Sequence, residues 1–125
     1  MSESREHHPI LVVDDDPDIR EAIIDVLEEN GHRTLSASNG DEALATLRST
    51  DETPCVILLD LMMPVMDGRA FRQAQQADPE LSKIPVIVLS AFRDSAETAK
   101  QLDVAGYLPK PVSIEALISM IDTFC

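Results

Sequence analysis

The sequence has few aromatic residues and no long apolar stretch. Its 125 residues include no tryptophan, three phenylalanines and one tyrosine, so the core must be aliphatic. No apolar run approaches the roughly 18 residues that span a bilayer, and the polar amino terminus does not resemble a signal peptide. We therefore expect a protein of the cytoplasm.

Cysteine is also scarce. Cys55 stands at the head of an apolar run, and Cys125 is the last residue. We expect no bridge between them, and a buried, reduced Cys55. Reduced thiols agree with the expected cytoplasmic location.

Basic residues are outnumbered by acidic ones, 10 to 23, which gives a net charge of −13. This balance argues against direct nucleic-acid binding, because neutralising phosphates requires patches of Lys and Arg. It also argues against adhesion to an anionic membrane. An acidic chain suits a protein that handles cations or meets basic partner surfaces.

The length is typical of one domain. Residues 1–8 are predicted to form a flexible tail, and residues 9–125 alternate strands with helices to form a single domain. The apolar runs at 10–13, 56–59, 86–89 and 106–109 predict strands, and the more polar run at 33–37 suits an edge strand. Five strands alternating with five helices predict an α/β, doubly wound parallel sheet with helices on both faces.

Helix signals stand between the strands. Asp16 can cap a first helix, Pro17 suits its first position, and Gly31 can close it. Asn39 is expected to begin a second helix. Further helices are expected from near Asp67 to Ala77, from Asp94, and from Ser113. The residues expected to be buried on these last three helices are Ala70, Phe71 and Ala74, then Ala96, Ala99 and Leu102, then Ile114, Leu117, Ile118 and Ile121.

Polar residues follow four of the strands: Asp14-Asp15, Asp60, Ser90 and Lys110. In a parallel sheet these ends meet at the carboxyl edge, where open α/β sheets bind ligands. Solvated turn residues would be the ordinary explanation for one such Asp. Two carboxylates about 4 Å apart, however, repel by roughly 4 kcal/mol at an effective dielectric near 20, so a cation is expected between them.

Mg²⁺ suits such a site best, because it combines a few carboxylates with waters and a phosphate. A calcium loop is set aside, since Ile19 occupies the position that needs Gly and Pro17 interrupts the pattern. Asp60 is also a candidate nucleophile towards phosphorus, with Lys110 as a mobile positive charge and Ser90 as a donor.

The order and spacing of these motifs resemble the receiver domain of two-component response regulators over residues 9–125. The matching segments are Val12-Val13-Asp14-Asp15, Leu59-Asp60-Leu61-Met62-Met63-Pro64, Met66-Asp67-Gly68, Leu89-Ser90-Ala91 and Tyr107-Leu108-Pro109-Lys110-Pro111. The resemblance implies a flavodoxin-like sheet of strand order 2-1-3-4-5, as in single-domain, chemotaxis-type regulators.

The resemblance also implies roles for individual residues. Asp60 would accept a phosphoryl group, and Mg²⁺ would be held by Asp14, Asp15, Asp60 and the backbone carbonyl of Met62. Ser90 and Lys110 would bind the phosphoryl oxygens, and the Lys110–Pro111 bond would be cis. Ser90 and Tyr107 match the switch pair, whose movement would alter the surface formed by the helix from Asp94, the strand at 106–109 and the helix from Ser113.

The implied partners are a histidine kinase or histidine phosphotransfer protein and a downstream protein target or an output domain. The chain would catalyse only its own Mg²⁺-dependent phosphorylation and dephosphorylation, and would be a monomer or weak dimer. Whether it acts alone or belongs to a longer protein is left open. Bulky Met62 and Phe92 near the phosphoryl group would hinder attacking water and prolong its lifetime.

Three other classes of protein share parts of this pattern. An aspartyl-nucleophile phosphatase needs a second acid two residues after the nucleophile, where Met62 stands. A flavin carrier needs a hydroxyl- and Gly-rich phosphate loop after the first strand, where three Asp stand. A pseudo-receiver that serves as a docking module without phosphorylation remains the alternative, although Asp14, Asp15, Asp60, Ser90 and Lys110 are all present.

Overall fold

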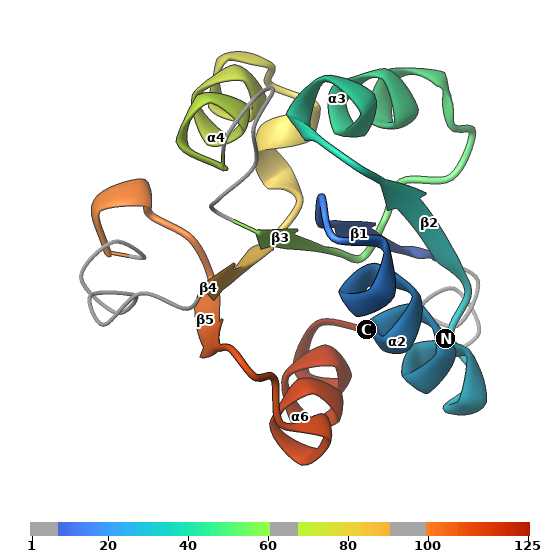
Figure 1. Cartoon of the computed structure of the whole chain (residues 1–125). Coiled ribbons are helices and arrows are strands. Elements are labelled where there is room, and N and C mark those ends of the chain that lie inside the picture. Colours follow the sequence, from blue (N-terminus) through green and yellow to red (C-terminus); the bar gives the residue numbers. More distant parts are fainter. Residues whose placement is uncertain (1–7, 61–67, 91–99) are drawn as a thin grey trace.

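A parallel sheet lies between two layers of helices (Figure 1). The structure, a computed structural model, describes residues 8–60, 68–90 and 100–125. The strands are β1 (Ile10–Val13), β2 (Thr34–Ala37), β3 (Val56–Asp60), β4 (Val86–Ser90) and β5 (Gly106–Pro109). The helices are α2 (Pro17–Glu29), α3 (Gly40–Ser49), α4 (Gly68–Ala77), the 3₁₀ helix η1 (Leu81–Lys83) and α6 (Ile114–Phe124).

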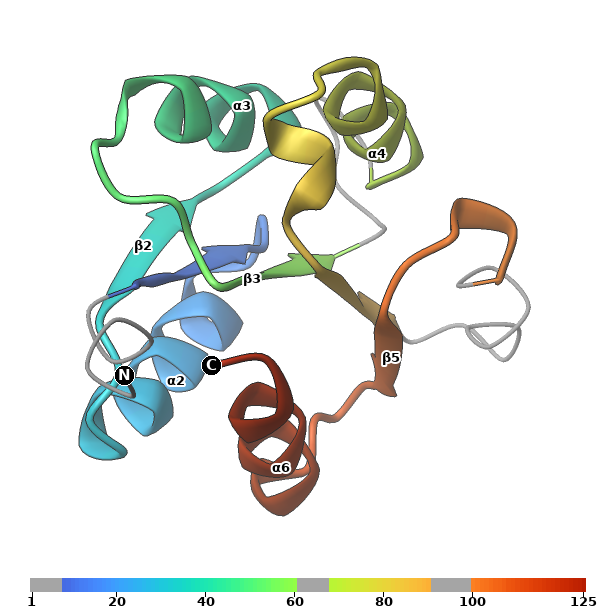
Figure 2. The same ribbon diagram turned by 180° about the vertical axis from the view of Figure 1, so that it is seen from behind.

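The sheet has the order β2-β1-β3-β4-β5, and every neighbouring pair is parallel. This confirms the predicted doubly wound, flavodoxin-like sheet, with the more polar strand β2 at an edge. Helices α2 and α6 lie on one face, and α3 and α4 lie on the other (Figures 1 and 2). All the carboxyl ends of the strands therefore face the same way, which is the condition for a shared site.

Two aliphatic cores form because successive strand residues point to opposite faces. Leu11 and Val13 join the core beneath α3 and α4, whereas Ile10 and Val12 join the core beneath α2 and α6. All four residues of β1 are fully buried, as expected for a strand that is covered on both faces. The strands thus form a rigid floor from which the polar residues at their ends emerge.

Three of the five predicted helix starts are confirmed, and those near Asp67 and Asp94 lie outside the described residues. The side chains of Asp16, Asn39 and Ser113 each accept a hydrogen bond from a backbone N–H in the first turn of α2, α3 and α6. After α2 the chain turns at Gly31, whose φ of +86° is the left-handed conformation that glycine adopts most easily. Local capping chemistry therefore sets most of the helix boundaries.

The predicted buried face of α4 was partly wrong. Phe71 is buried, but Ala70 is exposed, and the polar residues Arg72 and Gln75 are buried in its place. Hydrophobic spacing gives no weight to polar side chains, whose atoms here find partners inside the protein. Ile114, also expected in the core, is 59% exposed, because the first turn of a helix has neighbours on fewer sides.

The helix expected from Asp94 falls mostly outside the described residues. Residues 100–102 are helical, and Leu102 packs against the core beneath α3 and α4. Of the expected tail, residues 1–7 also lie outside the described part. Within the described part, every helix is too short or too polar to cross a membrane.

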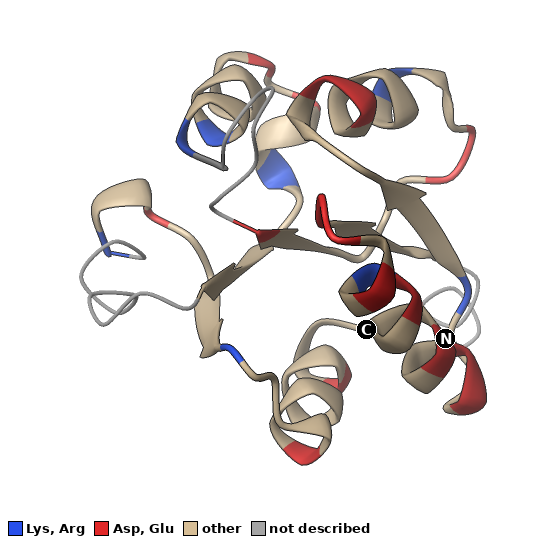
Figure 3. Ribbon diagram, viewed as in Figure 1, with Lys and Arg blue, Asp and Glu red and all other residues tan. Residues whose placement is uncertain are grey.

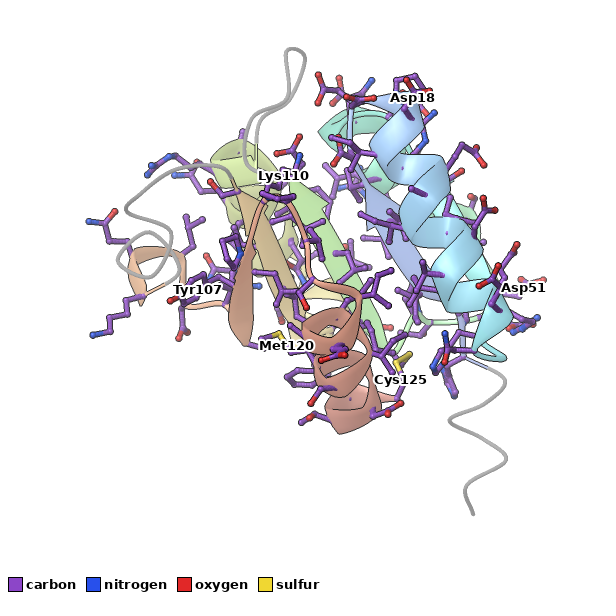
Figure 4. The ribbon with its side chains drawn as sticks, turned by 60° about the horizontal axis from the view of Figure 1, so that its bottom comes forward. Asp18, Asp51, Tyr107, Lys110, Met120 and Cys125 are labelled. Atoms are coloured by element: carbon purple, nitrogen blue, oxygen red, sulfur yellow. A yellow bond between two sulfur atoms is a disulfide. The ribbon has the colours of Figure 1, made fainter. Side chains whose placement is uncertain are left out.

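Contrary to the expectation from the sequence, Cys55 and Cys125 form a disulfide (Figure 4). Cys55 directly precedes β3 and so lies at the amino edge of the sheet. Helix α6 follows β5 and runs back about 16 Å, the length of its 11 residues, to that same edge. The two Cα atoms come to 5.6 Å, within the range that a disulfide spans. The two cysteines are far apart in the sequence, and they come close because α6 returns to the amino edge of the sheet.

Reducing this disulfide should destabilise the fold. The bond joins residues 70 apart, and closing a loop of that length in the unfolded chain stabilises the native state by about 4 kcal/mol in the chain-entropy model. Urea unfolding with and without a phosphine reductant should show a loss of free energy of that order.

The double variant Cys55→Ser/Cys125→Ser is the control and should unfold identically with and without reductant. Equal stability of oxidised and reduced wild type, or titration of two free thiols in denatured, unreduced protein, would contradict the bond.

Candidate functional site

The carboxyl ends of the central strands bring the predicted polar residues together. Asp14 directly follows β1, Asp60 and Ser90 end β3 and β4, and Lys110 directly follows β5. The ladder continues to this edge, because the Lys110 N–H donates to the Ser90 carbonyl at 2.9 Å. Four of the five predicted side chains thus extend from the ends of strands, and Asp15 follows in the β1–α2 turn.

Three carboxylates form the acidic part of the site. Oxygen atoms of Asp14, Asp15 and Asp60 lie within 4.8 Å of one another. Asp14 is completely buried and Asp60 is 4% exposed, whereas Asp15 is open to solvent. Figure 3 shows acidic colour at the adjoining ends of β1 and β3. Two buried acids and one exposed acid leave the cluster accessible from outside.

Lys110 supplies positive charge to this cluster. Its Nζ donates to Asp14 Oδ2 at 3.0 Å and lies 3.5 Å from Asp60 Oδ2. Burial alone would lower the pKa of the ammonium, but the hydrogen bond to Asp14 and the charges of Asp60 and Asp14 outweigh it and raise the pKa. Lys110 is therefore fully charged at neutral pH and spans the two buried carboxylates.

The buried acid Asp14 is further held by its neighbours. The Asp16 N–H donates to Asp14 Oδ1 at 2.9 Å, and Arg20 Nη1 donates to the Asp14 backbone carbonyl at 2.7 Å. Arg20 was not among the residues singled out from the sequence, where it is one more polar position on α2. Its guanidinium fixes the turn from which the acids project.

The carboxylates suit a hydrated divalent ion. Mg²⁺ binds oxygen ligands at about 2.1 Å, keeps several waters, and tolerates one or two carboxylates in its octahedron. The cluster offers hard oxygen donors only, with no thiolate or imidazole among its ligand atoms. Asp14, Asp15 and Asp60 therefore fit Mg²⁺. Met62, whose carbonyl is expected to complete the set, and Phe92 lie outside the described residues.

The expected switch residues occupy opposite environments. Ser90 is 1% exposed at the end of β4, whereas Tyr107 on the edge strand β5 is 39% exposed. Figure 4 shows the Tyr107 side chain at the outer side of β5, away from the core. The Lys110–Pro111 bond is cis, as the resemblance implies.

Comparison with known proteins assigns this arrangement. The family model of the response regulator receiver domain matches residues 10–122. The chain belongs to this family. Protein PilH of Pseudomonas aeruginosa is 35% identical over 115 residues, which cover 90% of this chain and 93% of PilH. The transcriptional regulator NtrC of Salmonella typhimurium is 39% identical, but this receiver domain covers only 24% of it.

Solved structures agree with this receiver fold. The chemotaxis protein CheY4 of Vibrio cholerae superimposes with a TM-score of 0.83 at 28% identity, covering 94% of this chain and 98% of CheY4. A receiver domain of a histidine kinase from Syntrophus aciditrophicus gives 0.82 at 33% identity, with coverage of 94% and 89%. The receiver fold thus occurs both in proteins of this length and as one part of longer proteins.

Removing the Lys110 charge should strengthen divalent-ion binding. In the ion-free site Lys110 is the counter-ion of Asp14 and Asp60, so an incoming Mg²⁺ competes with it. For Lys110→Gln we expect the Mg²⁺ dissociation constant to fall about fivefold, equivalent to ~1 kcal/mol. Amide chemical shifts followed during Mg²⁺ titration would measure it.

Lys83→Gln is the matched control, since Lys83 is exposed in η1 at the opposite edge of the sheet. It should bind Mg²⁺ as the wild type does. Weaker binding by Lys110→Gln would show that the ammonium supports the ion site instead of competing with it.

Proposed function

We propose that this receiver domain is a phosphoacceptor switch in which Asp60 takes a phosphoryl group from a phosphohistidine donor. The observation that carries the proposal is the contact of one lysine with two buried carboxylates, Asp14 and Asp60, at the carboxyl edge of the sheet. A site of this kind holds anionic oxygens beside a fixed positive charge. It is therefore suited to stabilising charge that moves during phosphoryl transfer.

In the proposed reaction an Asp60 carboxylate oxygen attacks the phosphorus atom of the donor. The new O–P bond gives an acyl phosphate, while the P–N bond to the donor imidazole breaks and its electron pair returns to that nitrogen. Asp14, Asp15, Asp60 and the Met62 carbonyl would hold Mg²⁺, which would neutralise phosphoryl charge. Lys110 would turn from the carboxylates to a phosphoryl oxygen, and the Ser90 hydroxyl would donate to another.

The output would be a change in surface. Phosphorylation adds roughly −1.5 to −2 charges beside Ser90 and Lys110, enough to bias a two-state element. We infer that Ser90 moves towards the phosphoryl group and that the Tyr107 ring turns inward from its present exposed position. The surface formed by the helix from Asp94, β5 and α6 would then present a different face to a protein target.

The proposed partners follow from this chemistry. The donor would be a histidine kinase or a histidine phosphotransfer protein, and the recipient of the signal a separate protein or an output domain. Acidic side chains exposed on α2, next to the site, favour a donor surface with positive charge (Figure 3). We propose that the protein is located in the cytoplasm and that its oligomeric state is a monomer or weak dimer. Disulfides are rare in the cytoplasm, so the Cys55–Cys125 bond would require oxidising conditions.

Incubation with acetyl phosphate and Mg²⁺ should add one phosphoryl group to the intact protein, measured by mass spectrometry. Asp60→Asn should gain none, because the nucleophilic carboxylate is missing, and EDTA should suppress the wild-type reaction. Asp78→Asn is the matched control: Asp78 lies between α4 and η1, so this variant should be phosphorylated normally.

No added mass, together with no amide shift changes at Ser90 or Tyr107 on adding beryllofluoride and Mg²⁺, would refute the switch. That result would favour the docking module without phosphorylation.

Tyr107 should report the switch by fluorescence. It is the only tyrosine in a chain without tryptophan, so tyrosine emission comes from one known position. Beryllofluoride with Mg²⁺ mimics the phosphoryl group and should turn the ring inward. Quenching by acrylamide should therefore decrease in the wild type and stay unchanged in Asp60→Asn; unchanged quenching in both would contradict the proposed movement of the ring.

A further inference from the structure

A buried polar network, separate from the acidic site, joins α4 to the η1 segment and to the turn before β5. Arg72 and Gln75 on α4 are 7% and 0% exposed, which is unusual for these residue types. Burial lowers the pKa of the Arg72 guanidinium, with the charge of Asp103 opposing. A guanidinium in such a place requires hydrogen-bond acceptors, and it has them.

The guanidinium reaches the end of the helical turn that precedes β5. Its Nε donates to the Leu102 carbonyl at 2.9 Å, and Nη2 donates to the Asp103 carbonyl at 2.6 Å. These are carbonyls at the end of a helix, where no backbone donor of the helix remains for them. Asp103 itself has a positive φ of 55°, a conformation uncommon for residues other than glycine. Arg72 therefore holds a tight turn that the backbone alone does not favour.

The other side of the network is anchored in rigid structure. Arg72 Nη1 donates to Gln75 Oε1 at 2.8 Å, and Gln75 Nε2 donates to the Leu81 and Ile84 carbonyls at 2.8 and 3.0 Å. Among the described residues, no buried side-chain nitrogen or oxygen lacks a partner. The network thus connects α4, the η1 segment and the turn at Leu102–Asp103 through five hydrogen bonds, three from the Arg72 guanidinium and two from the Gln75 amide.

The turn that Arg72 holds leads directly to β5, the strand that carries Tyr107. Asp103 is followed by Val104 and by Ala105, whose N–H donates to the Val86 carbonyl at 2.8 Å, and Tyr107 comes two residues later on β5. Helix α4 begins eight residues after Asp60. The network therefore joins α4, the first described element after Asp60 in the sequence, to the turn that leads to the strand with the exposed ring.

We propose that Arg72 is a positioning residue that fixes the turn at Leu102–Asp103 and so stabilises the arrangement in which the Tyr107 ring is exposed. This inference rests on the proposed function. The hydrogen bonds of Arg72 are present in the structure in which the Tyr107 ring is exposed. Loss of these bonds therefore destabilises the arrangement with the exposed ring. The phosphoryl group then has less resistance to overcome.

The test uses the full chain, beryllofluoride with Mg²⁺ as the probe, and Tyr107 quenching as the readout. In Arg72→Met, which keeps an apolar stem and removes every donor, the beryllofluoride concentration at half-maximal change should fall about fivefold, at the lower end of ordinary allosteric coupling. Arg72→Lys keeps the charge but lacks the fork that reaches both carbonyls, so its midpoint should lie between those of Arg72→Met and the wild type.

Leu47→Ala on α3 separates positioning from simple loss of stability. Leu47 lies in the core beneath α3 and α4 but makes none of the network's five hydrogen bonds. The Leu47→Ala variant should therefore melt at a lower temperature but keep the wild-type beryllofluoride midpoint. An unchanged or raised midpoint in Arg72→Met would overturn the inference. If that variant does not fold, an unchanged midpoint in Arg72→Lys would overturn it equally. A wild type that does not respond to beryllofluoride would instead refute the proposed function.

Discussion

The arrangement depends on electrostatic balance at one edge of a buried sheet. Asp14 and Asp60 are almost completely removed from solvent, and like charges so placed are costly unless a cation offsets them. Lys110 provides that offset with its 3.0 and 3.5 Å contacts to the two acids. An ion that enters the cluster, or a phosphoryl group that forms on it, must change this balance. The proposed response to phosphorylation would therefore act on the same contacts that stabilise the site.

The sequence predicted that these side chains converge, because parallel topology converts chain order into spatial proximity. The acids and the Ser90 hydroxyl follow continuous apolar runs, which indicate strands covered on both faces, whereas Lys110 follows the more exposed edge strand β5. Once five strands are aligned in parallel, their carboxyl ends must share one edge. Capping residues such as Asp16 and Asn39 added helix boundaries for the same reason, since their chemistry is local.

Three features escaped sequence reasoning, each for a physical cause. The contact of Cys55 with Cys125 depends on where α6 ends relative to β3, a matter of three-dimensional path. The exposure of Ile114 depends on how little surrounds the first turn of a helix. The buried positions of α4 were predicted wrongly because hydrophobic periodicity counts only apolar residues. Arg72 and Gln75 are polar, but they are buried because backbone carbonyls accept their hydrogen bonds. For the cysteines and for α4, the local pattern was consistent and a distant segment decided the outcome.

The two ends of the sheet are stabilised by different means, and the difference has consequences for a switch. At the amino edge a covalent bond joins β3 to the end of α6, so that edge is fixed under oxidising conditions. At the carboxyl edge, ion pairs and hydrogen bonds join the described strand ends. In the proposed switch these contacts would be exchanged for contacts to a phosphoryl group. Rearrangement in the proposed switch would therefore cost least near Ser90, Lys110 and Tyr107. The Arg72 network borders this region with hydrogen bonds to backbone carbonyls, whose direction fixes the position of the turn before β5. The proposed switch would need a fixed boundary as well as a mobile part, because a β5 without this anchor would not hold Tyr107 in two defined positions.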